Sequence, residues 1–108
     1  MIPEVDPHEA RALLDADEAL ALDVREAWEW SRGRIAGALH IPLGELAARL
    51  HELPQDRRIV AVCRSGSRSA MVAAALRQRG YDVVNLADGM LAWHAHGLPL
   101  EPATGGVA

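Results

Sequence analysis

The stretch Ile59-Val-Ala-Val-Cys-Arg-Ser-Gly-Ser-Arg-Ser-Ala70 decides the fold of this chain. Four apolar residues, mostly β-branched, lead into the only cysteine, and a short basic loop with one glycine separates that cysteine from an alanine-rich segment. A short apolar run is typical of a buried strand, whereas the alanine-rich segment favours a helix. The stretch therefore predicts a central strand over 59–62, a cysteine at its carboxyl end, and a helix from about Ser69 to Arg79.

On both sides of this stretch, short apolar runs alternate with segments of helical spacing. The predicted strands cover 2–5, 19–24, 38–41, 59–62 and 83–86, and the predicted helices cover 7–15, 25–32, 43–50, 69–79 and 89–95. Asp6 is the expected N-cap of the first helix, because Pro7 suits the first helical position and Glu9 completes a capping-box pattern. This alternation predicts an α/β domain, with a five-stranded, mostly parallel sheet and helices on both faces. We assign residues 1–101 to the domain and 102–108 to a flexible tail.

Composition restricts the classes of function. The chain has 108 residues and a net charge of −4, which argues against general binding to nucleic acid or to anionic membranes. It contains no apolar run long enough to cross a bilayer, and residues 1–6 do not resemble a secretion signal. A single cysteine excludes an internal disulfide and fits a reducing compartment. We therefore expect a cytoplasmic domain without a nucleic-acid or membrane partner.

The loop after the central strand places Cys63 where its thiol can ionise easily. A free cysteine has a pKa of about 8.5, and a helix N-terminus or nearby cations lower it to roughly 3.5–7.5. The N–H groups of residues 64–69 can turn inward as an anion-binding nest if Gly66 adopts a backbone conformation that other residues avoid. Arg68 opposes the dipole of the predicted helix, which indicates that an anion is bound there.

A lone cysteine at a strand end is usually a small buried apolar residue. The strand, the glycine-containing basic loop and the following helix together reverse that expectation for Cys63. Ser65, Ser67 and Ser69 are also candidates for helix caps, a role compatible with a reactive loop.

Two thiolate chemistries fit such a loop. Cysteine phosphatases separate the cysteine and the arginine by five residues, whereas only four residues lie between Cys63 and Arg68. The shorter loop favours sulfur transfer, in which the thiolate attacks the outer sulfur of a donor and holds it as a persulfide. Because the chain has no second cysteine, the sulfur has to leave to an outside acceptor such as cyanide, a small thiol or a protein. A small cysteine phosphatase or arsenate reductase and a non-catalytic binding module remain as alternatives.

At this point the chain resembles the rhodanese family, specifically its small single-domain members, over about residues 4 to 100. Four ordered motifs carry the resemblance: Leu22-Asp-Val-Arg-Glu26, Gly33-Arg-Ile-Ala-Gly-Ala-Leu-His-Ile-Pro42, Cys63-Arg-Ser-Gly-Ser-Arg68, and the segment Gly80 to Trp93 that ends with Gly97-Leu-Pro99. Two positions depart from the family pattern: Arg34 stands where a histidine is usual, and Asp88 replaces a usual glycine.

The resemblance implies a rhodanese-like fold, a persulfide on Cys63 and thiosulfate:cyanide sulfurtransferase activity. It implies that the donor anion is held by the loop residues Arg64, Ser65, Gly66, Ser67 and Arg68. It also implies that Asp23 and Arg25 support the site, and Ser69 is assigned the same supporting role. The expected partners are a small anionic sulfur donor and a thiol, cyanide or protein acceptor.

The remaining polar residues point to no cofactor or metal. Asp23 at a strand end is expected to form an ion pair with an arginine rather than to act as an acid or base. His40 is expected to satisfy a backbone group. His94 and His96 are two residues apart on a predicted helix and do not share a face, which argues against a metal site. No dinucleotide-binding or phosphate-loop motif is present.

Overall fold

The computed structural model describes residues 2–108 and contains one sheet of five parallel strands. In chain order the strands are β1 (Glu4–Val5), β2 (Ala19–Asp23), β3 (Leu39–His40), β4 (Arg58–Val62) and β5 (Val83–Leu86). Their order across the sheet is β1-β5-β4-β2-β3, and every pairing is parallel. The predicted five-stranded sheet is confirmed, with β4 at its centre.

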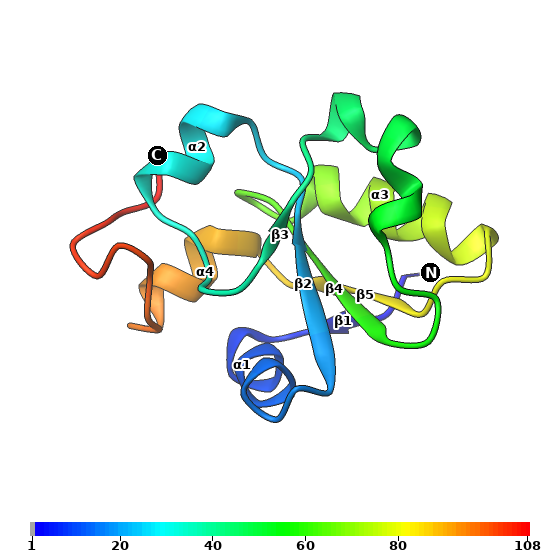
Figure 1. Cartoon of the computed structure of the whole chain (residues 1–108). Helices are drawn as coiled ribbons and strands as arrows, with labels where there is room; N and C mark the ends of the chain where they lie inside the picture. Colours follow the sequence, from blue (N-terminus) through cyan, green and yellow to red (C-terminus); the bar gives the residue numbers. More distant parts are fainter. Residues whose placement is uncertain (1) are drawn as a thin grey trace.

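Helices cover both faces of this sheet (Figure 1). They are α1 (Pro7–Asp15), α2 (Ala27–Arg32), α3 (Ser67–Gln78) and α4 (Gly89–Ala95), with two 3₁₀ helices, η1 (Leu43–Glu45) and η2 (Ala47–Glu52). Helices α1 and α4 lie on one face, and α3 lies on the other with η1 and η2. Asp6 caps α1, and the predicted capping box with Glu9 is present.

The side chains of β4 explain its central place. Ile59 and Ala61 point into a core shared with α3, whereas Val60 and Val62 point into a second core shared with α1 and α4. All four side chains are fully buried, since consecutive residues of a strand face opposite sides of the sheet and both sides are covered here.

The carboxyl ends of β2, β4 and β5 lie at one edge of the sheet. Asp23, the last residue of β2, is in register with Val62, the last residue of β4. Cys63 follows directly, so it lies at the middle of this edge, and α3 begins four residues later. Ligands of open parallel sheets bind beyond this edge.

Three of the five predicted helices differ from the structure, and four of the strands differ by one or two residues at their ends. Helix α2 begins at Ala27 rather than at residue 25, and α3 begins at Ser67 rather than Ser69. The continuous helix predicted over 43–50 is wrong, because this segment forms two 3₁₀ helices. Its leucines Leu43 and Leu46 are three residues apart, which matches one turn of a 3₁₀ helix.

Residues 101–108 run back toward α2 (red in Figure 1). Arg34 and Glu101 exchange two main-chain hydrogen bonds of 3.1 and 2.8 Å, and the Gly106 N–H donates to the Arg32 carbonyl at 3.0 Å. The flexibility of residues 102–108 stays a prediction, but their position beside α2 was not foreseen. Across residues 2–108, none of the helices has the length and apolar character to span a membrane.

Candidate functional site

The loop after β4 wraps its N–H groups around the sulfur of Cys63. Gly66 has a φ of +97°, in the left-handed region that favours glycine. This conformation directs its N–H to the Cys63 Sγ at 3.1 Å. The expected conformation of Gly66 is therefore present, and Gly66 rather than a serine is the N-cap of α3.

Ser69 supplies two more donors to the same sulfur. Its N–H lies 3.4 Å and its hydroxyl 3.3 Å from the Cys63 Sγ, and both residues are buried. Burial by itself raises the pKa of Cys63. The Ser69 hydroxyl and the N–H groups of Ser69, Gly66 and Ser65 stabilise the thiolate, so the net result is a pKa below the ordinary value of a cysteine.

Two carbonyl groups of the loop accept hydrogen bonds from β5 and α4. Asn85 on β5 donates its side-chain amide to the Gly66 carbonyl at 3.0 Å. The Cys63 carbonyl accepts from the Met90 N–H at 2.9 Å at the start of α4. The loop passes so close to Gly89 that a β-carbon there would clash with the Cys63 carbonyl oxygen. Sequence reasoning missed Asn85, whose side chain is buried within β5.

Asp88 precedes Gly89 in the turn that opens α4. It adopts a left-handed conformation, with a φ of +58°. Aspartate is one of the few residues other than glycine that visits this region readily. The departure from the family pattern at this position is therefore compatible with the turn.

Arg68 is engaged by a carboxylate that sequence reasoning missed. Its two terminal nitrogens donate to the two carboxylate oxygens of Glu29 at 2.8 and 2.9 Å. Glu29 lies in the first turn of α2, 39 residues earlier in the chain. Hydrogen bonds from Arg68 hold the pKa of Glu29 below its ordinary range, so Glu29 is ionised at neutral pH. The anion that meets Arg68 in this structure is therefore part of the protein.

Arg64 lies in a different environment. It is exposed, and its Nε donates to the main-chain oxygen of Ala108. Ser65 and Ser67 are also exposed, and their hydroxyl oxygens lie 3.1 Å apart. The predicted loop residues therefore have three environments: Gly66 donates to the sulfur, Arg68 is paired with Glu29, and the side chains of Arg64, Ser65 and Ser67 face solvent.

Asp23 and Arg25 form a buried ion pair beside the loop, as expected for Asp23. The Asp23 carboxylate accepts from the Arg25 guanidinium at 2.7 Å, and Arg25 also donates to the Gly33 carbonyl at 2.9 Å. The His40 ring hydrogen-bonds the Arg25 carbonyl at 2.8 Å, which confirms the expected backbone role of His40. This network joins the ends of β2 and β3 to the C-terminal end of α2.

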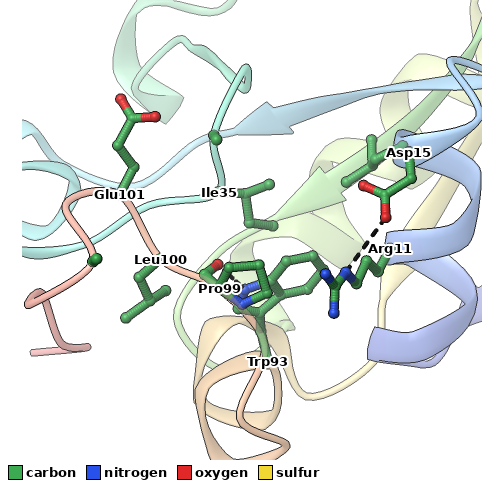
Figure 2. A pocket seen from close by; sticks show the side chains of 10 residues that line it. Arg11, Asp15, Ile35, Trp93, Pro99, Leu100 and Glu101 are labelled. Atoms are coloured by element: carbon green, nitrogen blue, oxygen red, sulfur yellow. Dashed lines mark hydrogen bonds and ion pairs between the residues drawn. The ribbon is translucent and has the colours of Figure 1, made fainter.

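A separate hollow of about 360 Å³ lies between α1, α4 and the chain around residue 100. Figure 2 shows Ile35, Trp93 and Leu100 around it and the ion pair between Arg11 and Asp15 at one side. None of the loop residues 63–69 lines this hollow. It therefore does not belong to the candidate site around Cys63.

The arrangement at Cys63 suits a nucleophile that takes up one small atom. The sulfur is stabilised as an anion by three donors, and Cys63 is only 1% exposed. Within residues 2–108, no cluster of three His, Cys, Asp or Glu side chains is placed to hold a metal ion. The chemistry available here is thiolate attack on an atom that protrudes into the loop.

Known proteins are similar to this chain in sequence and in fold. A model of the family described as Rhodanese-like domain matches residues 6–96. The chain is 39% identical to a sulfurtransferase of Allochromatium vinosum over 97% of this chain and 100% of that protein. It is 32% identical to a thiosulfate sulfurtransferase of Actinobacillus succinogenes over 94% and 93% of the two chains. A crystal structure of a rhodanese-related protein from Thermoplasma volcanium superposes with a TM-score of 0.86, at 28% identity, over 91% and 96% of the two chains.

Proposed function

The chain belongs to the family of rhodanese-like domains, and we propose that it is a sulfurtransferase that carries sulfane sulfur on Cys63. Its relatives named sulfurtransferases support an enzyme of sulfur transfer in general. The observation that carries the specific proposal is the set of three hydrogen-bond donors within 3.4 Å of the Cys63 Sγ. Such a cradle stabilises an anionic sulfur both before and after transfer.

The first step loads the enzyme. The Cys63 thiolate attacks the outer sulfur of a donor such as thiosulfate, a new S–S bond forms, and the S–S bond of the donor breaks. The electron pair of that bond leaves with the donor fragment, which is sulfite when the donor is thiosulfate. The product is a Cys63 persulfide, whose outer sulfur lies among the loop N–H groups.

The second step unloads the enzyme. A nucleophilic acceptor attacks the outer sulfur, and the electron pair of the S–S bond returns to Cys63 as a thiolate. Cyanide yields thiocyanate, and a thiolate yields a new persulfide. Because the chain has one cysteine, the acceptor is a separate molecule, either a small thiophile or a protein.

The loop residues have different roles in donor binding. Arg64, Ser65 and Ser67 face solvent and meet the incoming anion, while Gly66 directs its N–H to the sulfur. Arg68 keeps N–H hydrogens beyond the two that it gives to Glu29, and we assign these to the donor. Asp23, Arg25 and Ser69 support this arrangement. A cytoplasmic location is part of the proposal, because a reducing compartment keeps the single thiol free.

Intact-mass measurement tests the proposal. After incubation with a sulfur donor, the mass of the protein should rise by one sulfur atom, and cyanide should reverse the change and release thiocyanate. Cys63→Ser is the matched control, because it keeps the size of the side chain and removes the nucleophile. Equal masses and equal rates for the two proteins would refute the mechanism.

Two further measurements separate the alternatives. Robust Cys63-dependent hydrolysis of an aryl phosphate would support a cysteine phosphatase instead. A Cys63 that titrates near an ordinary thiol value and takes up sulfur from no donor would support a non-catalytic binding module.

A further inference from the structure

We propose that Glu29 is a specificity-determining residue that selects sulfur donors of low negative charge, such as organic persulfides and thiosulfonates, over dianionic donors such as thiosulfate. This inference rests on the proposed function, because it concerns the donor that loads Cys63. It starts from the pairing of Arg68, in the first turn of α3, with a carboxylate from α2.

Glu29 is held in place and does not move aside easily. Its side chain is only 5% exposed, and one carboxylate oxygen also accepts the Glu26 N–H at 3.0 Å at the start of α2. Both oxygens are therefore fixed, one by Arg68 and the other by Arg68 and α2 together. The charge of Arg68 is therefore already neutralised by Glu29 when a donor anion approaches the loop.

The other groups of the site do not replace that charge. The donors from Gly66 and Ser69 are directed to the sulfur of Cys63, which is itself negative as a thiolate. Arg64 is exposed, so water and salt screen its charge. Its Nε also donates to the main-chain oxygen of Ala108. A dianion that approaches the Cys63 thiolate therefore gains little attraction from Arg64.

Removal of the Glu29 charge should therefore act on donors according to their charge. A nearby carboxylate repels a dianion about twice as strongly as a monoanion at the same distance. Methanethiosulfonate is a monoanion and thiosulfate is a dianion, and both offer an outer sulfur bonded to an oxidised sulfur. With methanethiosulfonate the Cys63 thiolate forms the new S–S bond, and methanesulfinate leaves with the electron pair of the broken bond.

The test compares kcat/KM for these two donors, with cyanide as the acceptor. We expect Glu29→Gln to raise the ratio of thiosulfate to methanethiosulfonate about tenfold. Glu29→Asp keeps the charge and should leave the ratio within about twofold of wild type even if both rates fall. Glu18→Gln is the matched control, because this substitution changes the net charge by the same amount. Glu18 is exposed and directly precedes β2, so it lies at the amino ends of the strands, away from Cys63. The substitution should leave the ratio unchanged.

A purely structural role of Glu29 would lower the rates of both donors by the same factor, and that result would overturn the inference. The double variant Glu29→Gln/Arg68→Gln keeps the test open if the single variant fails to fold, because it leaves no unpaired charge. It restores the charge balance of wild type, so its donor ratio should lie within about threefold of the wild-type ratio even though both rates fall with the loss of the Arg68 contacts to the donor. A tenfold fall in that ratio would contradict charge selection by the pair.

Failure of this inference is distinguishable from failure of the proposed function. If Cys63 gains one sulfur by mass while the donor ratio ignores Glu29, only the role of Glu29 is wrong. If neither donor loads Cys63, the proposed function itself fails and the inference fails with it.

Discussion

Two arginine–carboxylate pairs lie beside the Cys63 loop and differ mainly in burial. The Asp23–Arg25 pair has an N–O distance of 2.7 Å, and its side chains are 1% and 0% exposed. The Glu29–Arg68 pair has a distance of 2.8 Å, but the Arg68 side chain is 31% exposed. The same chemical contact therefore occurs once in the protein interior and once at the mouth of the site.

The difference in burial assigns different tasks to the two pairs. The Arg25 Nη2 that donates to Asp23 also donates to the Gly33 carbonyl, so the inner pair ties the end of β2 to the far end of α2. Glu29 lies on that same helix and reaches Arg68 from it. The Asp23–Arg25 pair thus holds α2 in place, and Glu29 on α2 neutralises the charge of Arg68 beside the loop.

The largest expected effect is the loss of the inner pair. Asp23→Ala leaves the Arg25 guanidinium buried without a carboxylate, and removal of one partner of a buried pair costs about 3–5 kcal/mol. We expect the free energy of unfolding to fall by that amount in urea denaturation, with an unchanged slope. A loss below about 1 kcal/mol would mean that Arg25 finds solvent or another partner, and the contrast between the pairs would disappear.

The second prediction concerns the outer pair. Glu29→Gln should lower the free energy of unfolding by about 1–2 kcal/mol at pH 7, since a hydrogen bond to a charged group is lost and Arg68 can turn to solvent. Denaturation of both proteins at neutral pH measures this difference. A loss of stability as large as that of Asp23→Ala would show that the exposure of Arg68 does not reduce the cost of removing its partner.

The difference between wild type and Glu29→Gln should also depend on pH. Hydrogen bonds from Arg68 lower the pKa of Glu29 in the folded protein from 4.5. The stability that this ionised carboxylate contributes is fully present above about pH 4.5 and is lost as the pH falls through the lowered folded pKa. The two denaturation curves should therefore converge at acid pH. If the difference in stability persists at acid pH, it comes from packing of the Glu29 side chain and not from its charge.

Much of the fold follows from the chain because its apolar pattern has one consistent solution. The run over 59–62 is apolar on both faces, which only a central strand covered by helices can satisfy. Segment 43–50 escaped prediction because leucines three and four residues apart fit both 3₁₀ and α helices. The decision between them depends on packing against the sheet, which the local sequence does not contain.

The residues of the site could likewise be predicted most directly where they lie close to Cys63 in the sequence. Gly66 and the serines near Cys63 are visible in the sequence because they lie within six residues of the cysteine. Glu29 and Asn85 are not visible, since they come from another helix and another strand and look like ordinary members of each. One signal pointed toward Glu29: the unfavourable place of Arg68 at a helix start, which requires an anion but does not say whose.

A further prediction concerns a neutral hydrogen-bond donor, the Ser69 hydroxyl, in contrast to the charged pairs. Ser69→Ala removes the hydroxyl that lies 3.3 Å from the Cys63 Sγ and stabilises the thiolate. The pKa of Cys63 should therefore rise, and the thiolate fraction at neutral pH should fall. We expect alkylation by iodoacetamide at pH 7 to slow about threefold, as fits the loss of one modest hydrogen bond. The rate plotted against pH should shift to higher pH without a change in its plateau, and a shift to lower pH would contradict the role of Ser69.

The smallest effect is expected at a third pair, Arg58–Asp82, which has a distance of 3.2 Å and side chains that are 44% and 51% exposed. Asp82→Asn should lower the free energy of unfolding by about 0.5 kcal/mol or less, because water already solvates both charges. The main-chain bond from the Ile59 N–H to the Asp82 carbonyl survives the change. In 1 M salt the difference from wild type should vanish. If Asp82→Asn instead lowers the free energy of unfolding as much as Glu29→Gln does, burial does not determine how much each pair contributes to stability. The burial of Glu29 would then not explain the strength of its pairing with Arg68.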